Sequence, residues 1–185
     1  MPPTAKANRG PSAGPENRRA LIAAAREVFA TDGLSAPLSA VARRAGVGQG
    51  SLYRHFPERM DLAVAVFDEN LTELEAFVDN PDSTLDALLN LVIEQAVVST
   101  AFIDLIWANS HDARVLHLGD RLRSMVEREL TREKEAGRIG AHVDPEDVLL
   151  AVSMLAGVLA RTDADDRPAA GRRAVTLFTL AFSPR

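Results

Sequence analysis

Residues 38–56 read LSAVARRAGVGQGSLYRHF, the pattern of two short helices joined by a tight turn. Gly46 falls where such a turn needs a left-handed backbone, a conformation that glycine adopts at low cost. Ala42 is small enough for the point where the two helices cross. A miniature core comes from three apolar residues, Val41, Val47 and Leu52. The polar residues after Gly46 are left facing outward on a helix narrow enough for the major groove of DNA, so the segment predicts a helix-turn-helix.

Helical periodicity continues on both sides of this motif, and no alternating strand pattern of useful length occurs. In front of it, apolar residues recur at helical spacing over 17–32, and Gly33 supplies a stop signal. Behind it, we expect helices over about 58–78, 84–108, 113–136 and 144–161, and a last one after Gly171. The predicted fold class is therefore all-α, with a three-helix front and a helical bundle behind it.

The chain divides into three predicted parts. Residues 1–15 are rich in Pro, Ala and Gly without a hydrophobic period, so we expect a disordered arm. Residues 16–57 form the helix-turn-helix domain, and residues 58–185 form the helical domain.

The two ends of the chain differ in charge. Residues 1–59 carry nine Lys/Arg and four Asp/Glu, a balance of +5, whereas the remainder carries twelve against twenty-two, or −10. A basic front and an acidic back indicate that only the front meets phosphate. Chance clustering is the alternative.

Several function classes are excluded by composition. The absence of cysteine rules out disulfides and thiolate metal sites. The most apolar stretch, 88–107, contains polar residues and does not predict a membrane span, and no signal peptide precedes it, so we expect a cytoplasmic protein. The four histidines, His55, His111, His117 and His142, lack metal-ligand spacing, and no serine sits in a nucleophile elbow. We therefore expect no enzyme activity, no metal and no cofactor.

Residues 17–67 resemble the TetR family of transcriptional regulators. The resemblance is strongest in the run Ala45-Gly46-Val47 through Ser51-Leu52-Tyr53-Arg54-His55-Phe56-Pro57. The preceding helix also matches the first helix of the family, in Arg18, Arg19, Ala25, Phe29 and Gly33. Ser51 stands where threonine is usual and Arg59 where lysine is common, and both keep the character of the position.

This resemblance implies a sequence-specific DNA-binding regulator. Its relatives imply a homodimeric repressor that a small apolar or amphipathic ligand releases from a palindromic operator. The alternative is a ligand-independent dimeric DNA-binding or scaffold protein.

The resemblance also implies roles for individual residues. The start of the recognition helix, Gln49, Gly50 and Ser51, is placed for base edges. Phosphate contacts are expected from Tyr53, His55 and Arg59, with Arg43, Arg44 and Arg54 as further candidates. Packing of Tyr53 against the first helix, and a purely helix-terminal role for His55, are the alternatives. Arg43 and Arg44 are adjacent on a helix and cannot both point the same way.

Two further sets of residues follow from the expected helical domain. Pocket candidates, for which ordinary core packing is the alternative, are Phe67, Leu71, Leu88, Val92, Gln95, Phe102, Trp107, His117, Met125 and Met154. Candidates for a dimer interface, for which a place in the protomer's own core is the alternative, are Val148, Val152, Leu155, Ala156, Leu159, Ala174, Leu177, Phe178 and Ala181.

Overall fold

The computed structural model describes residues 14–94, 108–109, 111–163 and 165–185, and these form α-helices without any strand. The all-α prediction is confirmed. The chain separates into two compact units, one ending at Val66 and the other beginning at Phe67. None of the described helices is long and apolar enough to cross a membrane.

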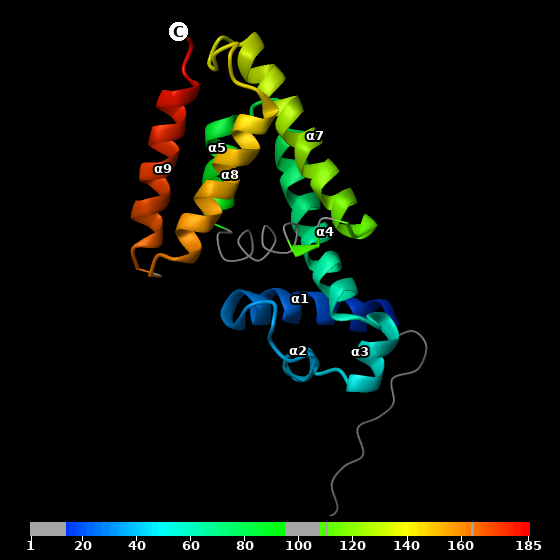
Figure 1. Ribbon diagram of the computed structural model, residues 1–185. Coiled ribbons are helices and arrows are strands. Elements are labelled where there is room, and N and C mark those ends of the chain that lie inside the picture. The colour runs from blue at the N-terminus through cyan, green and yellow to red at the C-terminus, as the bar shows by residue number, and fades with distance from the viewer. Residues whose placement is uncertain (1–13, 95–107, 110, 164) are drawn as a thin grey trace, which may run out of the picture. The chain divides into compact units, whose positions relative to one another are not determined.

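The first unit is built on α1 (Gly14–Asp32), which lies across α2 (Leu38–Ala45) and α3 (Gln49–His55) (Figure 1). Helix α1 begins before the predicted residue 17, and α2 and α3 agree with the predicted helix-turn-helix. The first part of α4 (Arg59–Val78) also belongs to this unit. Its core consists of residues that are at most 3% exposed: Leu21, Ile22, Ala25, Phe29, Val41, Ala42, Leu52, Phe56, Leu62, Ala63 and Val66.

The turn between α2 and α3 depends on Gly46. Its backbone is left-handed, with φ 66° and ψ 21°, as the sequence predicts. Its N–H donates to the carbonyl of Arg43 at 3.2 Å, and the N–H of Val47 donates to that of Ala42 at 3.0 Å. This is a Schellman ending, which satisfies the last carbonyls of α2 while it turns the chain toward α3.

The second unit contains the rest of α4 and four further helices: α5 (Leu85–Glu94), α7 (Ala113–Glu135), α8 (Pro145–Ala160) and α9 (Arg167–Phe182). Helix α8 contacts α5, α7 and α9 (Figure 1). The predicted start of α8 is confirmed, because Asp144 and Asp147 form a capping box with Pro145 in the first turn. Of the predicted helix 84–108, the structure describes the part up to Glu94.

Arginines of α7 hold the end of α4 in place. Arg121 binds Glu75 through two hydrogen bonds, of 2.9 and 2.7 Å, and also contacts Asp68. Further along, Arg132 donates to the carbonyls of Val78 at 2.5 Å and Asn80 at 3.0 Å. Long charged side chains therefore fix α4 to α7 in this unit, alongside apolar packing.

Candidate DNA-binding surface

Helix α3 turns one apolar residue inward and its polar residues outward. Leu52 is 1% exposed and anchors the helix in the core of the first unit. Gln49, Gly50 and Arg54 are exposed, Tyr53 is 52% exposed, and Ser51 and His55 are half-buried. The structure thus brings the predicted base-contacting residues together at the start of an accessible helix.

Two glycines, Gly48 and Gly50, lie at the N-terminus of α3. Gly48 is the N-cap, in an extended conformation, and its carbonyl accepts hydrogen bonds from the N–H groups of Ser51 at 2.9 Å and Leu52 at 3.1 Å. A Cβ built on Gly50 would meet no described atom within 4 Å. Nothing in the described protein's own packing therefore requires a glycine at position 50.

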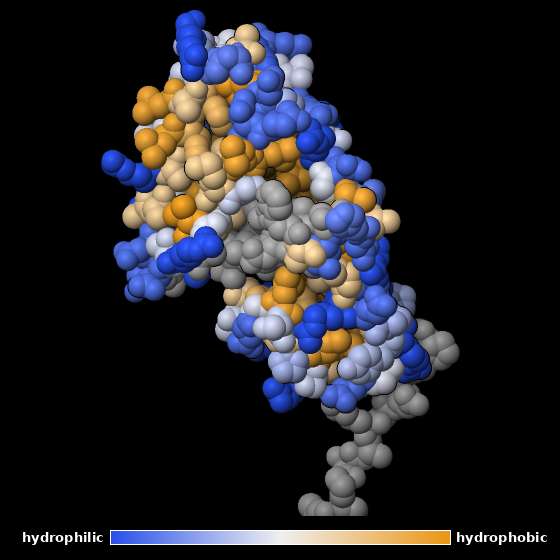
Figure 2. Space-filling model, in the orientation of Figure 1, coloured by the Kyte–Doolittle hydropathy of each residue, from blue (hydrophilic) through white to orange (hydrophobic). Residues whose placement is uncertain are grey.

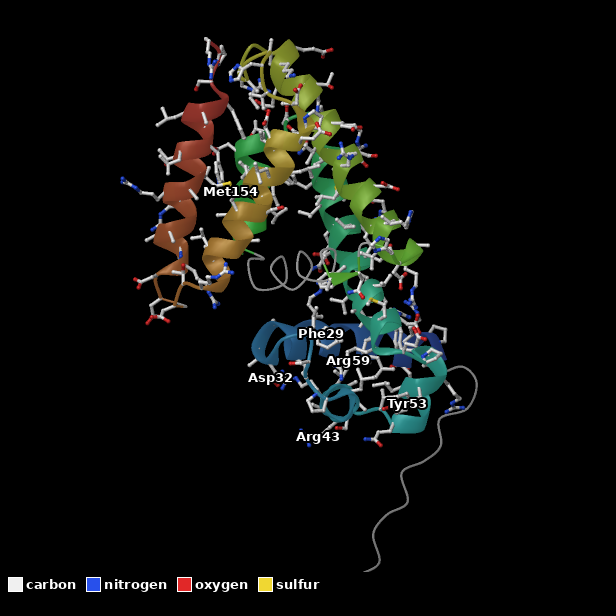
Figure 3. All side chains as sticks on the ribbon, in the orientation of Figure 1. Phe29, Asp32, Arg43, Tyr53, Arg59 and Met154 are labelled. Atoms are coloured by element: carbon white, nitrogen blue, oxygen red, sulfur yellow. The ribbon has the colours of Figure 1, made fainter. Side chains whose placement is uncertain are left out.

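The two adjacent arginines of α2 have different surroundings. Arg44 turns back to α1, where its Nε donates to Glu27 Oε2 at 2.6 Å. Arg43 is exposed and lies with Tyr53 on the lower side of the unit in Figure 3. The two arginines thus point in different directions, as expected for neighbours on a helix, although both are exposed.

The remaining basic candidates are held more closely. Arg54 donates from Nε to the carbonyl of Gly50 at 3.1 Å, so its guanidinium lies along the outer face of α3. The ring of His55 lies 6.4 Å from that of Phe56, centroid to centroid. The exposure of Tyr53 argues against the alternative in which this side chain is buried against the first helix.

Arg59 has a different set of contacts from the predicted one. Its Nη1 donates to the carbonyl of Leu34 at 2.7 Å and also to that of Ala36, both in the loop between α1 and α2. The guanidinium therefore ties the first residue of α4 to that loop. This contact has no counterpart in the sequence pattern, because it joins residues far apart in the chain.

Arg18 is a further basic residue near α3, and it was not among the DNA-binding residues predicted from the sequence. It is exposed on α1, and its guanidinium carbon lies 5.3 Å from the centroid of the Phe56 ring, a cation–π geometry. Because Phe56 directly follows α3, this contact holds a positive charge beside the end of that helix. In the sequence, the feature that could have indicated this contact is an arginine early in the first helix together with the aromatic residue before Pro57.

The described residues of the predicted pocket differ in their surroundings. Phe67, Leu71, Leu88 and Met125 are buried, whereas His117 and Met154 are exposed, and Met154 lines an open cleft beside α9. Gln95, Phe102, Trp107 and the side chain of Val92 lie outside the described residues. Leu88 and Met125 contribute to an apolar cluster completed by Leu74, Leu85, Leu89, Leu122, Val126, Val148 and Val152.

The dimer prediction needs a correction on α8. Its predicted residues, Val148, Val152, Leu155, Ala156 and Leu159, are at most 8% exposed and form the core of the protomer. The exposed large apolar residues of α8 are Leu150, Met154 and Val158, on the other face. On α9, the interface candidates Leu177 and Ala181 are exposed, Ala174 and Phe178 are half-buried, and Leu180 is exposed as well. Apolar residues gather over this part of the molecule in Figure 2.

No described set of three or more His, Asp or Glu side chains could hold a metal ion.

In the second unit the Arg121 guanidinium beside Glu75 holds the pKa of that carboxyl below its usual value, mainly through their hydrogen bonds. The same bonds raise the pKa of Arg121.

Residues 21–66 match the family model described as bacterial regulatory proteins, tetR family. No curated protein matches the sequence. Among solved structures, a TetR transcriptional regulator from Streptomyces coelicolor is similar, at 26% identity and a TM-score of 0.68 over 90% of this chain and 98% of that one.

Two further solved structures share the fold. One is a TetR transcription regulatory protein from Mycobacterium vanbaalenii, at 21% identity and a TM-score of 0.66, covering 93% of this chain and 98% of that one. The other is the transcriptional regulator FadR from Bacillus subtilis in complex with stearoyl-CoA, at 18% identity and a TM-score of 0.61, covering 87% and 97%.

Proposed function

We propose that the chain is a DNA-binding transcriptional regulator of the TetR family, and that it is a homodimeric repressor which a small molecule releases from a palindromic operator. The observation that carries the proposal is the exposed polar face of α3, anchored by Leu52, within the segment that matches the family. A helix presented in this way enters the major groove with its N-terminal residues foremost.

The proposed DNA contacts fall into two kinds. The proposed contacts to base edges come from Gln49, Gly50 and Ser51. A glutamine amide can form two hydrogen bonds with adenine, whereas a serine hydroxyl can donate to or accept from any base. Phosphates are held by the outward side chains Arg43, Tyr53 and Arg54, with His55 beside them. Arg44 and Arg59 support the surface through their contacts with Glu27 and with the loop carbonyls.

A homodimer is supported by the outer face of α8 and α9. Leu150, Met154, Leu177 and Leu180 are all more than half exposed, which is unusual for so many large apolar residues on adjacent helices. A single short recognition helix gives little affinity, whereas two half-sites read by a two-fold dimer give enough.

Ligand control is supported by the apolar interior of the second unit and by a relative. FadR from Bacillus subtilis, which shares the fold, was solved with stearoyl-CoA. We propose that a small apolar or amphipathic molecule binds among the helices of the second unit of this chain. To release DNA, it must favour the state that does not bind the operator by a few kcal/mol, on the order of the coupling seen in allosteric proteins.

We also propose that the protein acts in the cytoplasm and does not catalyse a reaction.

The second candidate function is that of a dimeric DNA-binding or scaffold protein without ligand control. Such a protein would differ from the proposed repressor in its selectivity for DNA sequence or in its response to small molecules. A packaging protein binds selected and random DNA alike, whereas an operator-specific regulator prefers its site by a factor of at least ~10³.

The test is selection of binding sites from a random DNA library with the full chain, followed by fluorescence anisotropy at fixed salt. We expect a palindromic consensus. Gln49→Ala should relax the preference at one position of each half-site, and Arg43→Ala should weaken all sequences equally. Arg128→Ala, which removes an exposed arginine of α7, is the matched control. Equal affinity for selected and random DNA would contradict the proposal.

A further inference from the structure

Asn70 is a polar residue on a side of α4 that is otherwise apolar. Positions 67, 70, 74 and 78 recur at steps of three and four, so they share one side of the helix. The other three are Phe67, Leu74 and Val78, and all four residues are at most 8% exposed. An amide group is therefore buried in the middle of an apolar helix face.

Asn70 differs from the other buried polar residues that the structure describes, which are Ser83, Glu129 and Glu133. Ser83 donates a hydrogen bond to Glu129 Oε2 at 2.9 Å. Glu133 accepts two hydrogen bonds from Arg138, at 2.8 and 2.9 Å. The side-chain amide of Asn70 has no hydrogen-bond partner among the described residues. Burial without a partner costs free energy, because the amide loses its bonds to water, so this group needs an explanation.

The cluster next to Asn70 is entirely apolar. Leu74, one turn further along α4, packs into the cluster that residues of α5, α7 and α8 complete. The nine residues of this cluster are all leucine, methionine or valine. A charged molecule buried there would lose its hydration without meeting an opposite charge, which is costly. A neutral molecule with an apolar body avoids this cost.

We propose that Asn70 selects the ligand of the second unit, and that this ligand is a neutral, largely apolar molecule with one carbonyl, hydroxyl or amide group. The inference rests on the proposed ligand control and names the chemical class of the ligand. The apolar part of the molecule packs among the leucines and valines of the cluster. Its polar group pairs with the amide of Asn70, which can both donate and accept a hydrogen bond.

The alternative is that Asn70 only stabilises the fold, and the two roles predict opposite effects on stability. An amide that the fold holds through hydrogen bonds stabilises the protein, so its removal lowers the melting temperature. An amide that waits for a ligand is unpaired in the free protein. Its replacement by leucine, which has a similar branched shape, therefore raises the melting temperature.

The first measurement is thermal unfolding of Asn70→Leu without any added molecule. We expect the melting temperature to rise by about 2–4 °C, because an apolar side chain replaces an unpaired buried amide. Ser83→Ala is the matched control, since it removes a buried polar group that has partners, and it should lower the melting temperature.

The second measurement is calorimetric titration with three probes that share an eight-carbon chain: octanamide, octanol and octanoate. We expect octanamide and octanol to bind the unmodified chain, and octanoate, which has nearly the shape of octanamide but a negative charge, to bind at least ~10-fold more weakly. Asn70→Leu should bind octanamide at least ~10-fold more weakly than the unmodified chain, because the polar group of the probe loses its partner. Asn70→Ala, which adds no bulk, should show the same loss. Ser83→Ala should bind octanamide as tightly as the unmodified chain.

The outcomes separate this inference from the proposed function. If no neutral probe binds, if octanoate binds as tightly as octanamide, or if Asn70→Leu lowers the melting temperature or keeps full binding, the inference is wrong. Ligand control still stands in the last three cases if a probe lowers the affinity for the selected operator. If octanamide binds through Asn70 but leaves that affinity unchanged, the assigned site stands and the proposed ligand control fails.

Discussion

Gly50 lies within a helix although the described part of the protein gives no reason for a glycine there. Its Cβ would point into open space, and its φ is not positive. Glycine in a helix is less favourable than alanine by up to ~1 kcal/mol. The residue therefore fits a surface that another molecule approaches closely, which agrees with a place against base edges.

Gly50→Ala should consequently separate stability from binding. We expect the free energy of unfolding to rise by up to ~1 kcal/mol, because alanine favours the helix. We expect affinity for the selected operator to fall, because a methyl group would stand between α3 and the DNA. Urea unfolding and fluorescence anisotropy measure the two effects. Gly119→Ala, at a helical site in α7 where an added Cβ would meet no described atom of the surroundings within 4 Å, is the control for stability alone.

A substitution of Arg59 can show whether this residue contacts a DNA phosphate or only stabilises the proposed DNA-binding surface. Arg59→Ala removes two hydrogen bonds to the carbonyls of Leu34 and Ala36, so we expect a loss of ~1–2 kcal/mol in stability. The slope of log affinity against log salt should stay as in the unmodified chain. A phosphate contact would lower that slope by about 0.9 for each subunit, which would contradict a purely supporting role.

At the scale of elements, the bond between α4 and α7 should respond to acid. The pKa of Glu75 is lowered in the folded state by Arg121, so the pair adds stability at pH values above the unfolded pKa of glutamate. That contribution is lost as the pH falls through the lower, folded-state pKa.

Glu75→Gln should therefore be less stable than the unmodified chain at pH 7, and the difference should shrink below about pH 4. Urea unfolding at several pH values between 7 and 3 measures it. Glu135→Gln, at an exposed position of α7, provides the control. A difference that stays constant with pH would mean that Glu75 acts through packing and not through its charge.

The elements that sequence could predict are those whose signals are local. The turn at Gly46 and the cap at Asp144 each depend on residues a few positions apart, and both appear where expected. Helix α8 shows the limit. Both of its faces are apolar, so periodicity could not tell the core residues Val148 and Leu155 from the exposed Leu150 and Met154.

The same limit applied to the candidate site. The exposure of the polar residues of α3 could be predicted from the sequence, because a single apolar residue, Leu52, lies among polar neighbours. The structure shows the same arrangement. Arg59 and Arg44 find their partners through contacts that join distant parts of the chain, which no local pattern contains. His117 falls near apolar residues in sequence but on the exposed side of α7.

For the whole molecule, DNA binding should depend on the α8–α9 face. Leu180→Glu places a charge on a side chain that is 69% exposed, so the melting temperature should change little. The dimer should dissociate at micromolar concentration, and operator affinity should fall by at least ~10-fold because the two half-sites are no longer linked. Sedimentation and anisotropy measure these effects. Leu116→Glu, at a 50% exposed leucine of α7, should leave both unchanged.

Helix α4 runs without interruption from Arg59 to Val78, and the boundary between the two compact units falls inside it, between Val66 and Phe67. Both of these residues are nearly inaccessible, at 1% and 2% exposure. There is thus no loop at which a chimera could be spliced or a protease could separate the halves cleanly. A chimera that joins another domain to the first unit should therefore preserve the residue count of α4, because deletion of one residue changes the direction of each later side chain of this helix by about 100°.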